Sequence, residues 1–164
     1  MLTLKSVSGR LKELFRGREH TAPERVETTP RTLLVVDDEE SICFSMSEYF
    51  SQHGFKVDTA REREEAEVLI KDTEYKVIIQ DLRLGGGRHP EGIDIIKLVH
   101  AQNPDTRIVV LTSYGSPEAE EEARNAGADA FLRKPKPLSQ VAQVVQGLIE
   151  SPRTRTAAVK QISI

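Results

Sequence analysis

Four short apolar runs, bounded by polar or turn-forming residues, divide the middle of the chain. They occupy residues 33–36, 77–79, 108–111 and 130–132. Because each run is continuously apolar and does not alternate with polar residues, it predicts a strand that is buried on both faces. Residues 56–59 are mixed in polarity, which predicts a fifth strand at the edge of the same sheet.

Between these runs, apolar residues recur at the spacing of amphipathic helices. The predicted helices span residues 41–52, 61–71, 93–102, 117–125 and 138–150. Strand and helix therefore alternate five times. Parallel strands need crossover connections, so this order predicts an α/β fold, a doubly wound five-stranded parallel sheet with helices on both faces. In such a sheet, ligands bind outside the carboxyl ends of the strands.

The two ends of the chain differ from this alternating region. Residues 1–30 combine a predicted basic amphipathic helix with a linker, and the apolar side of that helix carries Leu4, Val7, Leu11, Leu14 and Phe15. This segment either docks on a partner or an anionic membrane surface, or forms a marginal helix that merely covers the domain. We assign residues 31–150 to one domain and residues 151–164 to a basic tail.

Charge and composition narrow the class of protein. The formal net charge is -3, but the first 32 residues and the last 14 each carry +3, so the segment between them carries -9. An acidic domain argues against a nucleic-acid-binding core.

The sequence has neither a secretory signal nor an apolar run of about 20 residues, so we expect a cytoplasmic protein. Its single cysteine, Cys43, excludes a disulfide framework and is expected to be a buried thiol.

Polar side chains follow each central strand of the predicted sheet. Asp37 and Asp38 follow the first strand, Asp81 the third, Thr112 ends the fourth, and Lys134 follows the fifth. Three carboxylates at one edge repel one another unless a cation joins them, and a site of oxygen ligands suits Mg²⁺. A lysine and a hydroxyl beside them suit the oxygens of a phosphoryl group.

With these residues in this order, residues 31–150 resemble a response-regulator receiver domain of bacterial two-component signalling, of the stand-alone, chemotaxis-regulator-like kind with an N-terminal extension. The resemblance implies a flavodoxin-like fold with strand order 2-1-3-4-5. It also implies that Asp81 is the phosphoacceptor. By the same resemblance Asp37, Asp38, Asp81 and the backbone carbonyl of Arg83 bind Mg²⁺. We interpret Gln80 as the end of the strand and give it no catalytic role.

The resemblance further implies a conformational switch. Thr112 bonds the phosphoryl oxygen and Lys134 pairs with it, while Phe131, where the family more often has Tyr, turns inward on activation.

Two large side chains flank the acceptor site in the sequence. Arg83 stands two residues after the acceptor, and Tyr114 stands two residues after the switch threonine. Both are large enough to obstruct an attacking water. We therefore expect slow self-dephosphorylation.

The implied function is that of a single-domain response regulator. A sensor histidine kinase or a His-phosphotransfer protein donates the phosphoryl group to Asp81, and the chain catalyses only its own phosphorylation and dephosphorylation. Residues 151–164 are too few to fold independently, so we expect no DNA-binding domain there and signalling by binding an unnamed protein target.

Two alternatives stay open: an unphosphorylated interaction module with the same fold, and a Mg²⁺-dependent phosphatase. A dehalogenase-type phosphatase needs a second acid where Arg83 stands. One departure from the family is the loop of residues 85–92, which is about three residues longer than usual and begins with three consecutive glycines. With Arg88 and His89 it either tunes access and partner choice or is a tolerated surface insertion.

Overall fold

The computed structural model describes residues 30–86 and 90–151, in which strands and helices alternate as predicted. The strands are β1 Arg31–Val36, β2 Phe55–Ala60, β3 Val77–Gln80, β4 Arg107–Thr112 and β5 Ala130–Arg133. The helices are α1 Glu40–Gln52, α2 Arg63–Asp72, α3 Glu91–Gln102, α4 Pro117–Ala126 and α5 Leu138–Glu150. Every predicted element is present, with ends that differ by at most two residues.

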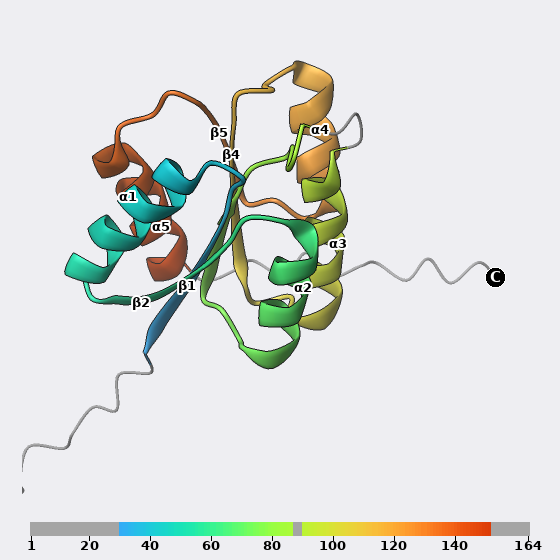
Figure 1. Ribbon diagram of the computed structural model, residues 1–164. Helices are drawn as coiled ribbons and strands as arrows, with labels where there is room; N and C mark the ends of the chain where they lie inside the picture. Colours follow the sequence, from blue (N-terminus) through green and yellow to red (C-terminus); the bar gives the residue numbers. More distant parts are fainter. Residues whose placement is uncertain (1–29, 87–89, 152–164) are drawn as a thin grey trace, which may run out of the picture.

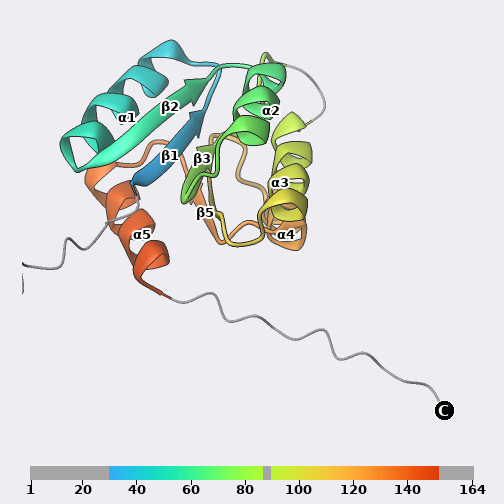
Figure 2. The ribbon, with the colours of Figure 1, turned by 90° about the horizontal axis from the view of Figure 1, so that it is seen from below.

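The five strands form one parallel sheet of order β2-β1-β3-β4-β5, which confirms the predicted topology. Helices α1 and α5 cover one face of the sheet, and α2, α3 and α4 cover the other (Figures 1 and 2). The strand order reverses between β1 and β3, whose carboxyl ends are therefore direct neighbours. A ligand site is expected at this point of a doubly wound sheet.

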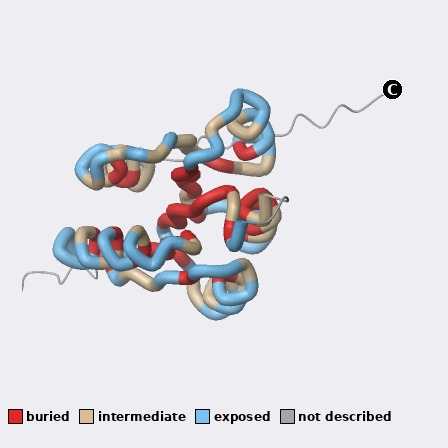
Figure 3. Tube along the Cα trace, turned by 45° about the horizontal axis from the view of Figure 1, so that its top comes forward, coloured by how far each residue is buried: buried red, intermediate tan, exposed pale blue. Residues whose placement is uncertain are grey.

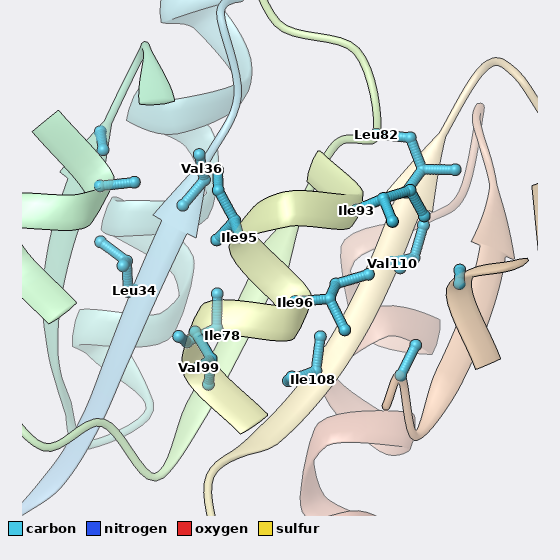
Figure 4. Packing of buried hydrophobic residues seen from close by; sticks show 14 of the residues in the cluster. Leu34, Val36, Ile78, Leu82, Ile93, Ile95, Ile96, Val99, Ile108 and Val110 are labelled. Atoms are coloured by element: carbon cyan, nitrogen blue, oxygen red, sulfur yellow. The ribbon is translucent and has the colours of Figure 1, made fainter. Parts of the chain in front are cut away.

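The sheet lies between two apolar clusters, one under each helical layer. Figure 3 shows the buried residues gathered along the centre of the molecule. Ile78 packs toward α3, where Ile95 and Ile96 are fully buried (Figure 4), whereas the next residue, Ile79, packs toward α1 and α5. Successive strand residues thus enter opposite clusters, which explains why the strand sequences are continuously apolar.

Helix α4 has a well-formed start but a small buried face. The Ser116 hydroxyl caps it by accepting a hydrogen bond from the Ala119 N–H at 3.1 Å, and Pro117 occupies the first turn. Toward the core it presents Ala123, which is buried, together with the partly buried Ala119 and Ala126. Three methyl groups bury little apolar area, so α4 is held on the sheet more weakly than α3.

Several predictions fall on parts of the chain that lie outside the described residues. They concern the helix and most of the linker of residues 1–29, Arg88 and His89 in the long loop, and the tail after Ser151. Within residues 30–86 and 90–151, none of the helices has the length and apolarity required to span a bilayer. Cys43 is buried, as predicted, and its thiol lies 3.2 Å from the carbonyl oxygen of Asp37.

Candidate functional site

Three aspartates converge at the carboxyl ends of β1 and β3. Val36 and Gln80 are register partners, so the residues that follow them emerge side by side, and the Asp81 N–H donates to the Val36 carbonyl at 2.9 Å. One carboxylate oxygen from each of Asp37, Asp38 and Asp81 lies within 4.8 Å of the others. Asp37 and Asp81 are buried and Asp38 is partly exposed. The three residues that the sequence indicated are thus brought together.

Lys134 extends from the end of β5 into this cluster. Its Nζ lies 2.6 Å from Asp37 Oδ2 and 3.0 Å from Asp81 Oδ2, and its side chain is only 10% exposed. Burial lowers the pKa of Lys134, but hydrogen bonds to Asp37 and Asp81 outweigh it and raise the pKa above its usual value. Burial raises the pKa of Asp37, and Lys134 opposes that effect. The ammonium group is therefore charged and shared between two carboxylates.

Glu39 also reaches the lysine, with Oε1 3.5 Å from Lys134 Nζ. Sequence reasoning gave this residue no part in the site. The signal in the sequence was its position directly after Asp37 and Asp38, which keeps its side chain near the acidic cluster. Its side chain is 58% exposed, so this third ion pair contributes little compared with the two buried ones.

Thr112 orients the acceptor carboxylate. Its hydroxyl is fully buried at the end of β4 and donates to Asp81 Oδ1 at 2.6 Å, while the Arg83 N–H lies 3.3 Å from the same oxygen. The Asp81 carboxylate is thereby held on one oxygen by Thr112 and on the other by Lys134. The resemblance implies that Thr112 bonds the phosphoryl oxygen, and in the unmodified chain its hydroxyl already points at the acceptor carboxylate.

The donor set of the cluster fits Mg²⁺. The convergent ligands are hard carboxylate oxygens, which Mg²⁺ prefers, and the partly exposed Asp38 leaves room for the waters that this ion retains. Asp38 Oδ2 accepts a hydrogen bond from the Gly85 N–H at 3.1 Å. Gly85 and Gly86 have φ values of +68° and +70°, a conformation that other residues rarely adopt, so the long loop turns tightly at its start.

Arg83 and Tyr114 meet beside the acceptor. The guanidinium carbon of Arg83 lies 3.7 Å from the centre of the Tyr114 ring, although the two residues belong to different loops. Such stacking of a cation on an aromatic face is attractive, by about 0.5–1 kcal/mol at exposed sites. The sequence indicated that both residues flank the acceptor, but their mutual contact depends on how the two loops approach.

Phe131 lies half-buried in β5, next to the strand that carries Thr112. It is the register partner of Val110 and packs against the cluster under α3 and α4. Thr112 ends the same strand two residues after Val110. The two predicted switch residues are therefore on adjacent strands, separated by a short step along the sheet.

The sequence model of the response regulator receiver domain matches residues 33–146. Together with the strand order and the acidic site, this match establishes that the chain belongs to the response regulator receiver domain family of two-component systems. Members of this family are signalling modules, and phosphorylation and Mg²⁺ binding at an acidic pocket are typical of them.

Among curated proteins, the chain is similar to the photosynthetic apparatus regulatory protein RegA of Cereibacter sphaeroides. The two are 31% identical over 121 residues, which cover 74% of this chain and 64% of RegA. The chain therefore spans less than two thirds of the length of this relative.

Two solved structures resemble the fold closely. One is a response regulator from Burkholderia pseudomallei with a phosphorylated aspartic acid and a calcium ion, at 29% identity and a TM-score of 0.67, covering 73% of this chain and 68% of that one. The other is the beryllofluoride-activated NtrC4 receiver domain dimer, at 33% identity and a TM-score of 0.67, covering 73% and 97%.

Proposed function

We propose that this chain acts as a response regulator whose Asp81 accepts a phosphoryl group from a histidine kinase or His-phosphotransfer protein in the cytoplasm. Its phosphorylated form then signals by binding a target protein. The observation that carries the proposal is the Asp81 carboxylate itself, buried and held between Thr112 and Lys134 with Asp37 and Asp38 beside it.

The chemistry follows from these contacts. An Asp81 oxygen forms the new P–O bond while the P–N bond to the donor imidazole breaks, and the imidazole nitrogen keeps the electron pair and takes up a proton. Lys134 pairs with the negative phosphoryl oxygens and Thr112 donates a hydrogen bond to one of them. Asp37, Asp38, Asp81 and the Arg83 carbonyl would hold Mg²⁺, which when bound neutralises charge on the transferred group.

The switch residues link phosphorylation of Asp81 to a change at the surface that the target protein binds. When Thr112 exchanges its bond to Asp81 for one to the phosphoryl oxygen, the loop between β4 and α4 moves with it. Phe131, on the neighbouring strand, turns inward as α4 shifts. A helix whose face toward the core consists of one buried and two partly buried alanines changes position at low cost. By the resemblance to the family, the target reads the surface formed by α4, β5 and α5.

A small phosphodonor tests the proposal. Incubation of the full chain with acetyl phosphate and Mg²⁺ is expected to add one phosphoryl group, seen as an increase in intact mass. Removal of Mg²⁺ with EDTA is expected to slow the reaction by about a hundredfold, since the metal supplies several kcal/mol of charge stabilisation. A chain that gains no phosphoryl group with Mg²⁺ and donor in excess is an unphosphorylated interaction module instead.

The contact between Arg83 and Tyr114 predicts a long-lived phosphoryl group. Replacing both residues by Ala uncovers the acceptor to water, and we expect the self-dephosphorylation rate to rise about tenfold, which corresponds to a barrier lower by about 1.4 kcal/mol. The decay of the phosphorylated mass after removal of the donor measures this rate.

The matched control is Phe44→Ala, since Phe44 is an exposed aromatic residue of α1 with 67% of its surface accessible. This substitution is expected to leave the decay unchanged. Equal decay rates for the wild type and the Arg83→Ala/Tyr114→Ala variant would show that the pair does not shield the acceptor.

A further inference from the structure

Gln80, the residue before Asp81, links the acceptor strand to the first turn of α3. Its side chain is 1% exposed, and its Nε2 donates to the Gly92 carbonyl at 2.5 Å. In the opposite direction, the Gly92 N–H donates to the Leu82 carbonyl at 3.0 Å. Two hydrogen bonds therefore join the segment around Asp81 to the start of α3, across the long glycine loop.

Gly92 has a close contact that only glycine allows. A Cβ at this position would lie 2.4 Å from the Asp81 carbonyl oxygen and 2.7 Å from the Leu82 Cα. Helix α3 thus begins directly on the backbone of the acceptor loop. Leu82 and Ile93 lie close together in the same apolar cluster (Figure 4), so the contact continues beyond the two hydrogen bonds.

The other end of the Gln80 amide is a buried acceptor without a partner. Within the described residues, Gln80 Oε1 is the buried side-chain atom that makes no hydrogen bond. An unpaired oxygen in the core destabilises the folded state, so an apolar side chain of similar length would be the more stable choice at this position. The neighbouring strand residues Ile78 and Val110 are both apolar and fully buried. The contribution of Gln80 therefore lies in its donor, which reaches α3.

We propose that Gln80 is a positioning residue for the phosphoryl acceptor. Its hydrogen bond joins the end of β3 to the start of α3 directly, and it thereby holds the Asp81 and Leu82 backbone in place. The inference rests on the proposed phosphorylation of Asp81 for its kinetic consequence. The tether itself is a property of the fold and is measurable without any phosphodonor.

Gln80→Met tests the tether, because methionine has a similar length and no donor. We expect the thermal midpoint to stay the same or rise, since the unpaired oxygen is removed. The maximal rate of phosphorylation by acetyl phosphate should fall about tenfold, because small displacements of a reacting group cost rate, while the half-saturating donor concentration changes little. Hydrogen exchange of the Gly92 amide should become at least about tenfold faster, because its bond to Leu82 is no longer supported.

Ile78→Met, on the same strand and facing the same cluster, is the matched control and should change neither the rate nor the exchange. Gln80→Leu provides a second variant without a donor. The inference is overturned if Gly92 exchange is unchanged in both Gln80 variants, or if their rates fall only in step with their thermal midpoints. If the wild type itself gains no phosphoryl group, the proposed function fails, and Gly92 exchange alone then decides whether the tether exists.

Discussion

Asp81→Asn is expected to abolish phosphorylation of the chain. The amide has nearly the same shape as the carboxylate, so Thr112 can still donate to its oxygen and the fold should be retained. An amide oxygen is a far weaker nucleophile, however, and Lys134 loses one of the two buried carboxylates with which it pairs. Intact mass after incubation with acetyl phosphate and Mg²⁺ measures the result, and we expect the adduct to disappear.

Asp105→Asn, at an exposed loop position on the chain, is the matched control and should be phosphorylated like the wild type. An adduct of equal yield in Asp81→Asn would mean that another residue accepts the phosphoryl group. Peptide mapping of that adduct would then identify the acceptor, with Asp37 and Asp38 as the nearest candidates.

Lys134→Met is expected to change phosphorylation and metal binding in opposite directions. The ammonium group lies 2.6 Å and 3.0 Å from two carboxylates, so it competes with a cation for the same negative charge. Without it the cluster carries one more net negative charge, and Mg²⁺ should bind more tightly. The phosphorylation rate should nevertheless fall by about a hundredfold or more, as when a fixed donor to the reacting group is removed from other active sites.

Amide chemical shifts followed during a Mg²⁺ titration measure the affinity, and intact mass against time measures the rate. Lys136→Met, two residues further along the loop, is the matched control for loss of one positive charge near the site. An unchanged phosphorylation rate in Lys134→Met would show that Lys134 only balances charge in the folded state. Weaker Mg²⁺ binding in Lys134→Met would contradict the competition between the ammonium group and Mg²⁺.

Most of the fold could be predicted because its signals are local. Continuous apolar runs such as the one that includes Ile78 predict buried strands, and Gly127 marks the end of α4, where its φ of +123° suits glycine. The acidic cluster was also predictable. Once the strands are known to be parallel, residues that follow them, such as Asp37 and Asp81, necessarily reach the same edge of the sheet.

The remaining features of the site depend on contacts between segments that are distant in the sequence, and no local pattern encodes such contacts. The bond from Gln80 to Gly92 requires knowledge of where α3 begins, and a polar residue ending an apolar strand was the only signal in the sequence. The stacking of Arg83 on Tyr114 depends in the same way on the approach of two loops. The loops that carry Arg83 and Tyr114 have no repeating pattern of apolar residues, so their paths are fixed only by the assembled structure.

The hydrogen bond from Gly85 to Asp38 joins the most unusual segment of this chain to its candidate metal site. Any ion that changes how Asp38 is bonded also changes the free energy of that loop conformation. If an ion at Asp38 changes the affinity of a partner protein for this loop by some factor, binding of that partner must change the affinity for the ion by the same factor. Partner binding at the loop and ion binding at the aspartates are then thermodynamically coupled.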